Sequence, residues 1–314
     1  MLNKNKILDC TLRDGGFTNN FNWTNSFVND YFKVINSLPV EFVEVGYWKQ
    51  ENKSSNKFYN INETDLIKFK KNCKKKISIM NDFHYCIKNV KNYPKKNDNL
   101  LSLIRMTSRI ENIDECVDFL NDLKNYTNLK ISLNIFNFSN YKNLDFQKII
   151  SSIKKSQVDY LYFADTHGSI DFFKLDRSKN KFFNKIRSLK NIGFHFHDNI
   201  GTAYSNYKYC LSSKFNIFDT TICGIGRGGG NLRTELIYNN EKIYNFINKY
   251  NKILNIPFNM YWHISGSTSV SNLYANYAIS KKLDISKFKL FCKKLKGRDK
   301  DNFNLSKIKN FFKK

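Results

Sequence analysis

Two histidines separated by one residue are the side chains of this sequence best suited to hold a metal ion. His195 and His197 lie in an apolar, aromatic run that begins near Gly193 and ends in a polar turn. In a β-strand, side chains two positions apart point to the same face, so the two imidazoles would stand side by side. Neutral imidazole is the commonest side-chain ligand of metals. The alternative is an ordinary pair of core or surface histidines, and the rest of the sequence has to decide.

The overall composition indicates a globular protein. With 314 residues the chain is long enough for one large domain or two smaller ones. Its 41% hydrophobic and 16% aromatic content is typical of folded proteins. No run approaches the roughly 20 apolar residues that cross a bilayer. Residues 1–6 contain no apolar core of a signal peptide. We therefore expect a cytoplasmic protein without a membrane partner.

Cysteine number and charge narrow the function classes further. Seven scattered cysteines without a C-x-x-C pair argue against a disulfide framework and against a cysteine zinc site. The net charge of +25 raises the question of nucleic-acid binding. However, the lysines are spread over helix-like segments, in a composition that is typical of an AT-rich genome. We expect no nucleic-acid partner, and a basic surface that favours small anionic substrates.

Eight strand-like segments that alternate with helix-like ones must position the histidine pair. The strands are predicted at 6–12, 41–47, 76–80, 101–106, 130–136, 160–165, 193–197 and 217–223. This alternation predicts parallel strands, and eight units over roughly 250 residues is the size of a (β/α)₈ TIM barrel. A doubly wound open sheet is the alternative, but Asp14-Gly15-Gly16 is not its G-x-G-x-x-G phosphate turn.

The alternation stops after about residue 255. Pro257 interrupts the pattern, Trp262 and His263 are predicted to lie in a loop, and residues 267–282 and 286–296 look helical. The sequence therefore predicts an α/β protein with a TIM-barrel catalytic domain at 1–255 and a short helical C-terminal extension at 256–314.

In a TIM barrel the chemistry lies at the carboxyl ends of the strands. In this chain those ends carry polar and charged residues, although the strands are otherwise apolar. They are, in order, Arg13 and Asp14, Glu44, Arg105, Asn134, Thr166, the histidine pair and Asn231. Buried charge is costly unless it is paired or bound to a metal. Their convergence therefore favours a metal site over an ordinary histidine pair, and we predict that Arg105, Asn134 and Thr166 bind substrate.

One carboxylate and two imidazoles from different strands would form a catalytic divalent-metal site. Asp14 is the best carboxylate because it would close strand one at the barrel mouth; alone, it could be a turn aspartate before Gly15. This ligand set suits Mn²⁺ or Mg²⁺, with Zn²⁺ or Co²⁺ as alternatives. Arg13 is always charged and suits an oxyanion such as an enolate. A metal that chelates a 2-oxo acid would acidify its C3 as a Lewis acid.

Three motifs carry a resemblance to a known superfamily. They are LDCTLRDGG at 8–16, HFHDNIGTAYSN at 195–206 and GIGRGGGNLRTE at 224–235. Together they resemble the metal-dependent TIM barrels that include 4-hydroxy-2-oxovalerate aldolase, isopropylmalate and homocitrate synthases, and hydroxymethylglutaryl-CoA lyase. The resemblance covers roughly residues 6–240 and is strongest to the aldolase-like proteins.

The resemblance implies a role for each matching residue. Asp14, His195 and His197 would bind the divalent cation, and Asn231 matches a further ligand of the synthase and lyase branches. Arg13 would stabilise the enolate of a bound 2-oxo acid or thioester. Glu44 matches a carboxylate near that arginine, or else only orients it.

The sequence also departs from the superfamily pattern. Gly16 and Phe17 stand where the synthases usually have a Glu-Gln pair, and no histidine base follows Asp14 as in the aldolases. The carrier of the proton is therefore open among His84, His167, His263, a tyrosine and metal-bound water.

These observations predict a divalent-metal-dependent aldolase, a carbon–carbon lyase that cleaves or forms a 4-hydroxy-2-oxo acid through a metal-bound pyruvate enolate. A Claisen-type acyl-CoA condensing enzyme or lyase is the first alternative. A catalytically inactive barrel that acts as a binding protein is the second. The expected partner is a small anionic 2-oxo acid, phosphorylated and CoA-linked forms included, and we expect a homo-oligomer.

Overall fold

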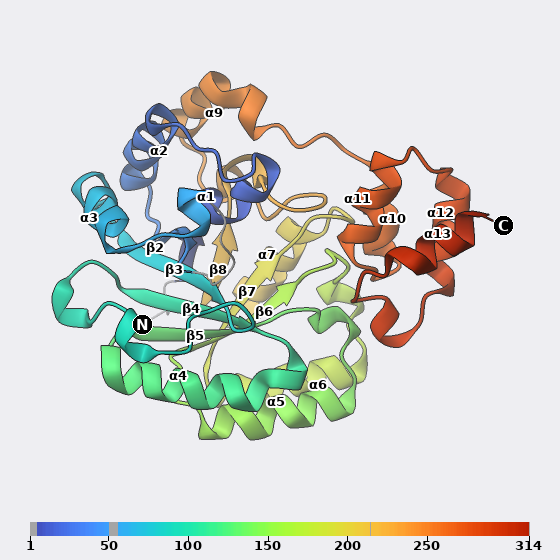
Figure 1. Cartoon of the computed structure of the whole chain (residues 1–314), viewed down its shortest axis with the longest axis horizontal. Helices are drawn as coiled ribbons and strands as arrows, with labels where there is room; N and C mark the ends of the chain where they lie inside the picture. Colours follow the sequence, from blue (N-terminus) through green and yellow to red (C-terminus); the bar gives the residue numbers. More distant parts are fainter. Residues whose placement is uncertain (1–4, 50–55, 214, 314) are drawn as a thin grey trace.

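The computed structural model describes residues 5–49, 56–213 and 215–313, and in it eight parallel strands form a closed barrel (Figure 1). Each strand pairs with its neighbour in sequence, and β8 closes the barrel against β1. The strands are β1 Lys6–Asp9, β2 Phe42–Tyr47, β3 Lys76–Asp82, β4 Leu103–Ser108, β5 Lys130–Ile135, β6 Tyr160–Asp165, β7 Asn191–Phe196 and β8 Ile217–Thr220. The predicted (β/α)₈ TIM barrel is confirmed. Residues 1–4, part of the segment without signal-peptide character, lie outside the described residues.

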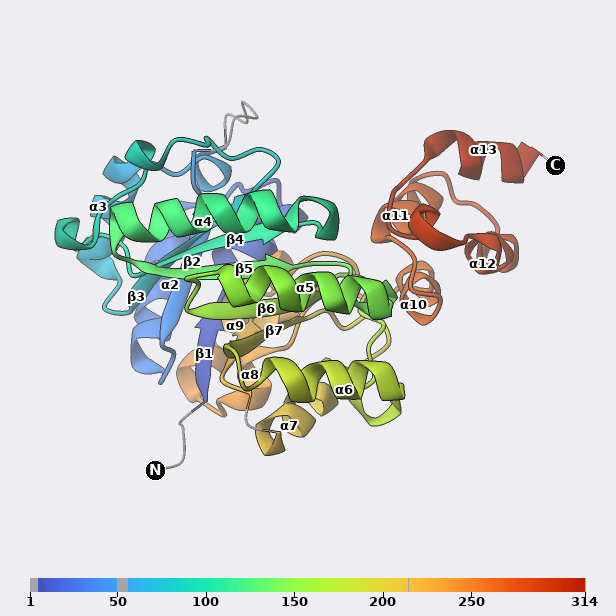
Figure 2. The ribbon, with the colours of Figure 1, turned by 90° about the horizontal axis from the view of Figure 1, so that it is seen from below.

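Helices surround the barrel and cover its outer face (Figures 1 and 2). Those that follow the strands are α2 Asn25–Ser37, α3 Glu63–Asn72, α4 Ile113–Thr127, α5 Asn143–Lys155, α6 Arg177–Ile186, α7 Ala203–Ser212, α8 Thr234–Ile237 and α9 Glu241–Leu254. In α4 the side chains of Cys116, Val117 and Leu120 are buried, because helical spacing places them on one face. Among the described residues, no helix is long and apolar enough to cross a membrane.

The first strand is shorter than predicted, and its end forms a helix instead. β1 ends at Asp9, and the one-turn helix α1 spans Thr11–Asp14. The carboxylate of Asp9 accepts the backbone N–H of Thr11 at 3.0 Å, which turns the chain out of the strand. The expectation that Asp14 closes the strand itself was therefore wrong. It ends the helix above the strand, still over the barrel mouth.

The eighth strand also ends early, and a glycine-rich segment follows it. We call residues 221–231 the β8 loop. β8 stops at Thr220 instead of residue 223, and Cys223 has a left-handed φ of 57°. Gly224, Gly228 and Gly230 follow with φ values of 66°, 59° and 88°, a region that side chains other than glycine rarely adopt. The glycines therefore let the loop fold back over the barrel end.

A helical extension lies at one end of the barrel and is reached by the segment after α9 (Figure 2). It contains α10 Met260–Ser267, α11 Asn272–Ser280, α12 Ile285–Lys294 and α13 Leu305–Lys313. The side chain of Asn259 caps α10, so the prediction of a loop at Trp262 and His263 was wrong. The extension has an apolar core of its own, and the division into two domains near residue 255 stays a prediction.

Candidate metal centre

The two histidines lie side by side, as their spacing predicts. Their ring centroids are 4.9 Å apart; His195 comes from β7 and His197 from the residue just after it. Asp14 joins them from α1, and the ligand atoms of the three residues all lie within 4.8 Å of one another. His195 Nε2 is 3.8 Å from Asp14 Oδ2. All three side chains are buried. The structure therefore brings together the three residues that the sequence assigned to the metal.

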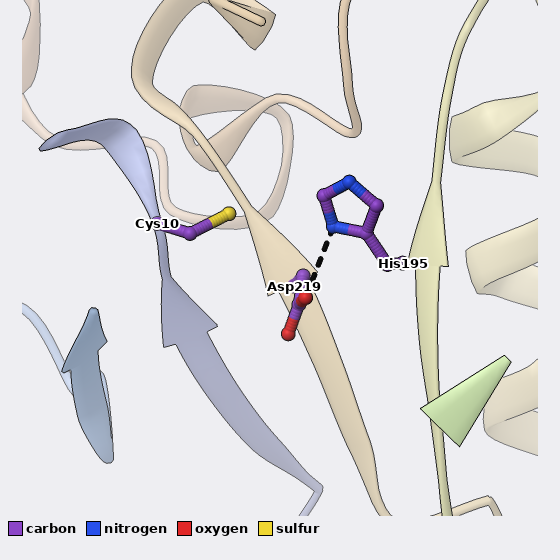
Figure 3. A group of neighbouring side chains, drawn as sticks. All are labelled: Cys10, His195 and Asp219. Atoms are coloured by element: carbon purple, nitrogen blue, oxygen red, sulfur yellow. Dashed lines mark hydrogen bonds and ion pairs between the residues drawn. The ribbon is translucent and has the colours of Figure 1, made fainter. Parts of the chain in front are cut away.

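Hydrogen bonds fix which ring nitrogen of each histidine is free. His197 Nδ1 lies 3.2 Å from the backbone carbonyl oxygen of Arg227. Because a carbonyl oxygen only accepts, Nδ1 must carry the proton and Nε2 keeps its lone pair. His195 Nδ1 similarly donates to Asp219 Oδ2 at 3.0 Å, and its second ring nitrogen points away from Asp219 (Figure 3). Metal-binding histidines are typically held in this way.

Asn231 and the charge state of Asp14 complete a donor set that fits a divalent cation. Asn231 Nδ2 donates to Asp14 Oδ2, while its Oδ1 is buried without a hydrogen-bond partner in the described part of the chain. Burial opposes ionisation of Asp14, but Arg13, both histidines and the Asn231 amide together hold its pKa well below the usual range. One ionised carboxylate, two imidazole nitrogens and one amide oxygen suit Mn²⁺, Mg²⁺, Zn²⁺ or Co²⁺.

A second group of metal-ligating residue types, Cys10, His195 and Asp219, shares one imidazole with the first (Figure 3). The protonation and charge of its surroundings make it a poor metal site. Burial raises the pKa of Cys10 well above the usual value, and the thiol points to the carbonyl oxygen of Thr220 at 3.5 Å. Asp219 Oδ2 accepts hydrogen bonds from both His195 Nδ1 and the guanidinium of Arg105, the latter at 2.6 Å. A protonated thiol and a neighbouring guanidinium both disfavour a bound cation. This group therefore orients His195 for the first group instead of binding a metal itself.

Buried ion pairs link both groups into one network beneath the barrel mouth. Arg13 Nη1 donates to Asp14, and Arg13 Nε donates to Glu44 at 2.6 Å. The other oxygen of Glu44 accepts a hydrogen bond from Arg105 Nη1 at 3.0 Å, and Arg105 Nη2 donates to Asp219. Burial opposes ionisation of Asp219, but Arg105 and His195 hold its pKa below the usual value. Three carboxylates and two guanidiniums leave the network one negative charge, which a divalent cation would convert to one positive charge.

The three predicted substrate-binding residues lie apart from the ligand atoms. Arg105 is completely buried, with its guanidinium 4.2 Å from the ring centroid of Tyr162, and is committed to the ion-pair network. Asn134 accepts a hydrogen bond from Ser132 within the barrel. Thr166 accepts the backbone N–H of Asn137 at 2.8 Å. Contact of these residues with substrate stays a prediction, and for Arg105 the geometry favours a positioning role.

The histidines considered as proton carriers lie elsewhere. His167 is buried, and its Nε2 lies 2.9 Å from the carboxylate of Asp301 in the extension. His84 is in an exposed turn after β3, and His263 is in α10. Among the described interactions, none connects these three rings to the ligand cluster. The structure therefore does not favour any of these three histidines as the proton carrier.

Asp219 and Tyr47 are functional-site residues that the sequence analysis missed. Asp219 is a carboxylate in the middle of an apolar strand, a signal that could have identified it. Tyr47 follows Gly46 at the end of β2, where the register with β3 shifts. Burial raises the pKa of Tyr47 to about 12, although the positive charge of Arg13 opposes the rise. The phenol is thus within electrostatic reach of the arginine beside the metal ligands.

Comparisons with known proteins agree with this geometry. The family model described as HMGL-like matches residues 4–251. A search of curated proteins finds no match. Among solved structures, the N-terminal domain of a candidate aldolase from Bacteroides vulgatus is 26% identical, with a TM-score of 0.73 over 88% of this chain and 96% of that one.

More distant structures share the fold. The HMG-CoA lyase of Bacillus subtilis is 15% identical, with a TM-score of 0.57 over 89% of this chain and 94% of that one. The carboxyl transferase domain of Rhizobium etli pyruvate carboxylase is 11% identical, with a TM-score of 0.63 over 93% of this chain and 55% of that one. Because the family model spans most of the sequence and the ligand cluster lies where the motifs predicted, the chain belongs to the HMGL-like family of metal-dependent TIM-barrel aldolases and lyases.

Proposed function

We propose that this protein is a divalent-metal-dependent aldolase that cleaves or forms a 4-hydroxy-2-oxo acid through the enolate of pyruvate, with Mn²⁺ or Mg²⁺ as the metal. The observation that carries the proposal is the orientation of Arg13. Its Nε and Nη1 donate to Glu44 and Asp14, while Nη2 makes no hydrogen bond within the described residues. The free N–H groups are therefore held beside the ligand cluster, where an oxyanion would develop.

Residues of the chain would bind and stabilise the substrate in defined ways. When bound, the metal would act as a Lewis acid on the 2-oxo acid. Asp14, His195, His197 and Asn231 hold it, and Arg13 donates hydrogen bonds to the enolate oxygen as negative charge develops there. Glu44 accepts a hydrogen bond from Arg13 Nε and so prevents rotation of the guanidinium. The positive charge of the loaded network favours an anionic substrate.

Tyr47 is the described side chain that we propose as the proton carrier. Its phenol is buried at the end of β2, the strand that packs against α1 and so against Arg13, and a pKa of about 12 keeps it protonated at neutral pH. It can therefore donate its proton to a developing alkoxide during carbon–carbon bond formation, which leaves a phenolate beside Arg13.

Exchange of the methyl protons of pyruvate in D₂O with Mn²⁺ tests the aldolase proposal. The wild type should catalyse exchange, and Arg13→Ala should reduce the rate by about 10²–10³-fold because a preorganised donor is lost. Arg187→Ala is the matched control, since Arg187 is exposed and its guanidinium donates to Asn184 and to the carbonyl of Ser213. Absence of exchange in the metal-loaded wild type, or wild-type exchange in Arg13→Ala, would contradict the proposal.

A Claisen-type reaction on an acyl-CoA is the second candidate, because the family includes HMG-CoA lyase-like members and Asn231 lies at the centre. It predicts release of free CoA from acetyl-CoA in the presence of 2-oxo acids, which the aldolase does not. An inactive binding barrel instead predicts purified protein without stoichiometric Mn, Mg, Zn or Co. Thiol release and metal analysis therefore separate all three functions.

A further inference from the structure

A concave site lies behind the β8 loop, on the side away from the metal ligands. The cavity has a volume of about 360 Å³ and lies between the β8 loop and the last turns of α9. This volume is within the range of small-molecule sites. The lining includes Cys223, Arg233, Asn251, Lys252, Leu254 and Ile256. The proposed reaction does not use this cavity.

The charges that line the cavity are all positive. Within the described ranges, the side chains of Arg233 and Lys252 make no ion pair or hydrogen bond, and no acidic residue lines the cavity. The neighbouring carboxylate of Glu235 accepts the backbone N–H of Cys223 at 2.9 Å, and burial raises its pKa. Burial also raises the pKa of the Cys223 thiol to about 12, so the thiol stays neutral. Two unpaired cations in one concavity favour a ligand with two negative charges.

The remaining lining residues suit the organic part of such a ligand. Ile247, Leu254 and Ile256 provide an apolar wall, and the amide of Asn251 provides both a donor and an acceptor. A small apolar surface beside a few placed polar groups is the usual composition of a small-molecule site. The cavity therefore suits a compact organic dianion better than a bare ion.

The β8 loop separates this cavity from the metal centre by a single layer of backbone. A Cβ on Gly226 would lie 2.5 Å from the carboxylate of Asp14, so this glycine faces the metal ligands. A Cβ on Gly224 would lie 3.0 Å from Arg233 Cγ, and one on Gly230 would lie 3.1 Å from Ile256 Cδ1. These two glycines thus lie against residues that line the cavity. A molecule in the cavity contacts the loop without touching the reacting atoms.

We propose that this cavity binds a small organic dianion, a phosphate monoester or a dicarboxylate, and acts as an effector site for the metal centre. The same loop supplies Asn231, and its Arg227 carbonyl fixes the tautomer of His197. A ligand that engages Arg233 therefore changes the position of metal-binding groups. By linkage, the metal changes the affinity for the dianion by the same factor. The coupling rests on the proposed role of Asn231, whereas the binding itself does not.

Calorimetric titration of the full-length, Mn²⁺-loaded protein tests binding. Glycerol 3-phosphate, succinate and inorganic phosphate are the probes; the first two distinguish phosphate from carboxylate ligands, and the third tests the need for an organic part. We expect saturable one-site binding of at least one organic probe, weakened about tenfold in Arg233→Gln and less in Lys252→Gln. Lys242→Gln, on the same helix but outside the lining, is the matched control and should bind as the wild type does.

Asp14→Asn distinguishes the cavity from the metal centre, because a probe in the cavity should still bind when the metal ligand is changed. A fall of probe affinity in Asp14→Asn that exceeds the coupling factor, no saturable binding of any probe, or equal weakening in Lys242→Gln and Arg233→Gln would overturn the proposed site.

The coupling is tested by competition for Mn²⁺ with a fluorescent chelator. Saturating probe should change the Mn²⁺ affinity of the wild type by about fivefold or more, the lower end of usual coupling, and leave that of Arg233→Gln unchanged. An unchanged affinity in the wild type would overturn the effector role. These measurements need no turnover, so a failed pyruvate exchange would refute the aldolase proposal and leave this one standing.

Discussion

The two sides of the His195 imidazole offer similar groups of residues but have opposite chemical character. On the Nε2 side lie Asp14 and His197, and on the Nδ1 side lie Asp219 and Cys10, each group within 4.8 Å. On the first side, lone pairs remain after all protein hydrogen bonds are made. On the second, the thiol is protonated and the carboxylate is shared with Arg105. Asp219 Oδ1 also has no hydrogen-bond partner in the described part of the chain. Proximity of ligand atoms and unused lone pairs therefore do not define a metal site by themselves; the protonated thiol and the neighbouring Arg105 guanidinium distinguish the Nδ1 side.

The residues on the Nδ1 side nevertheless position the residues on the Nε2 side. Asp219 holds the proton of His195 on Nδ1, which leaves Nε2 free and makes it a stronger donor. Arg105 keeps Asp219 ionised, and through Glu44 it also keeps Arg13 in place. This comparison predicts graded effects of substitution on metal binding. Metal binding should be lost for Asp14, weakened for Asp219 and unchanged for Cys10.

The largest effect is expected for Asp14→Asn. The substitution removes the charged ligand while keeping its shape, so Mn²⁺ binding should fall by more than the roughly 10–100-fold typical of losing a group that only orients a ligand. Metal content after dialysis and chelator competition measure the change. Unchanged circular dichroism serves as the folding control. Wild-type metal content in this variant would contradict the assignment of the Nε2 side.

An intermediate effect is expected for Asp219→Asn. The amide cannot hold the His195 tautomer as the carboxylate does, so Mn²⁺ affinity should fall about 10–100-fold. Arg105 also loses one of two buried partners, and the free energy of unfolding should fall by about 3 kcal/mol. Chelator competition and denaturant unfolding measure both quantities.

Asp176→Asn is the matched control for this substitution, because Asp176 is an exposed helix cap and asparagine caps equally well. If Asp219→Asn kept the wild-type Mn²⁺ affinity, the two sides of His195 would be independent.

Most of the barrel and the ligand cluster could be predicted from local patterns. The alternation of strands and helices and the polar residues at strand ends depend on neighbours in sequence. The histidine pair, Asp14 and Asn231 could therefore be predicted to lie together, and their binding of a metal stays a prediction. The helical ending of strand one could not be read in this way. The indole of Trp23 fixes the carbonyl of Leu12 at 2.8 Å, a contact across eleven positions.

The ion-pair network was missed because it is made between strands. The position of Arg105 at a strand end suggested substrate binding, but its partners Glu44 and Asp219 come from β2 and β8. A period of two gives the face on which a side chain lies, and the pairing across a barrel depends on tilt and register. The start of the extension was also predicted wrongly, as a loop at Trp262 and His263. Pro257 marked a break, but the capping role of Asn259, two residues later, was not recognised.

The smallest effect is expected for Cys10→Ala, which tests the thiol on the Nδ1 side directly. Mn²⁺ affinity should stay at the wild-type value, because burial keeps the thiol protonated and it donates its hydrogen bond to the Thr220 carbonyl. Removing one buried atom should lower the free energy of unfolding by about 1 kcal/mol. Chelator competition measures the first quantity and denaturant unfolding the second. If Cys10→Ala instead weakened Mn²⁺ binding as strongly as Asp219→Asn, the thiol would share in metal binding. Protonation and neighbouring charge would then no longer distinguish the two sides of His195.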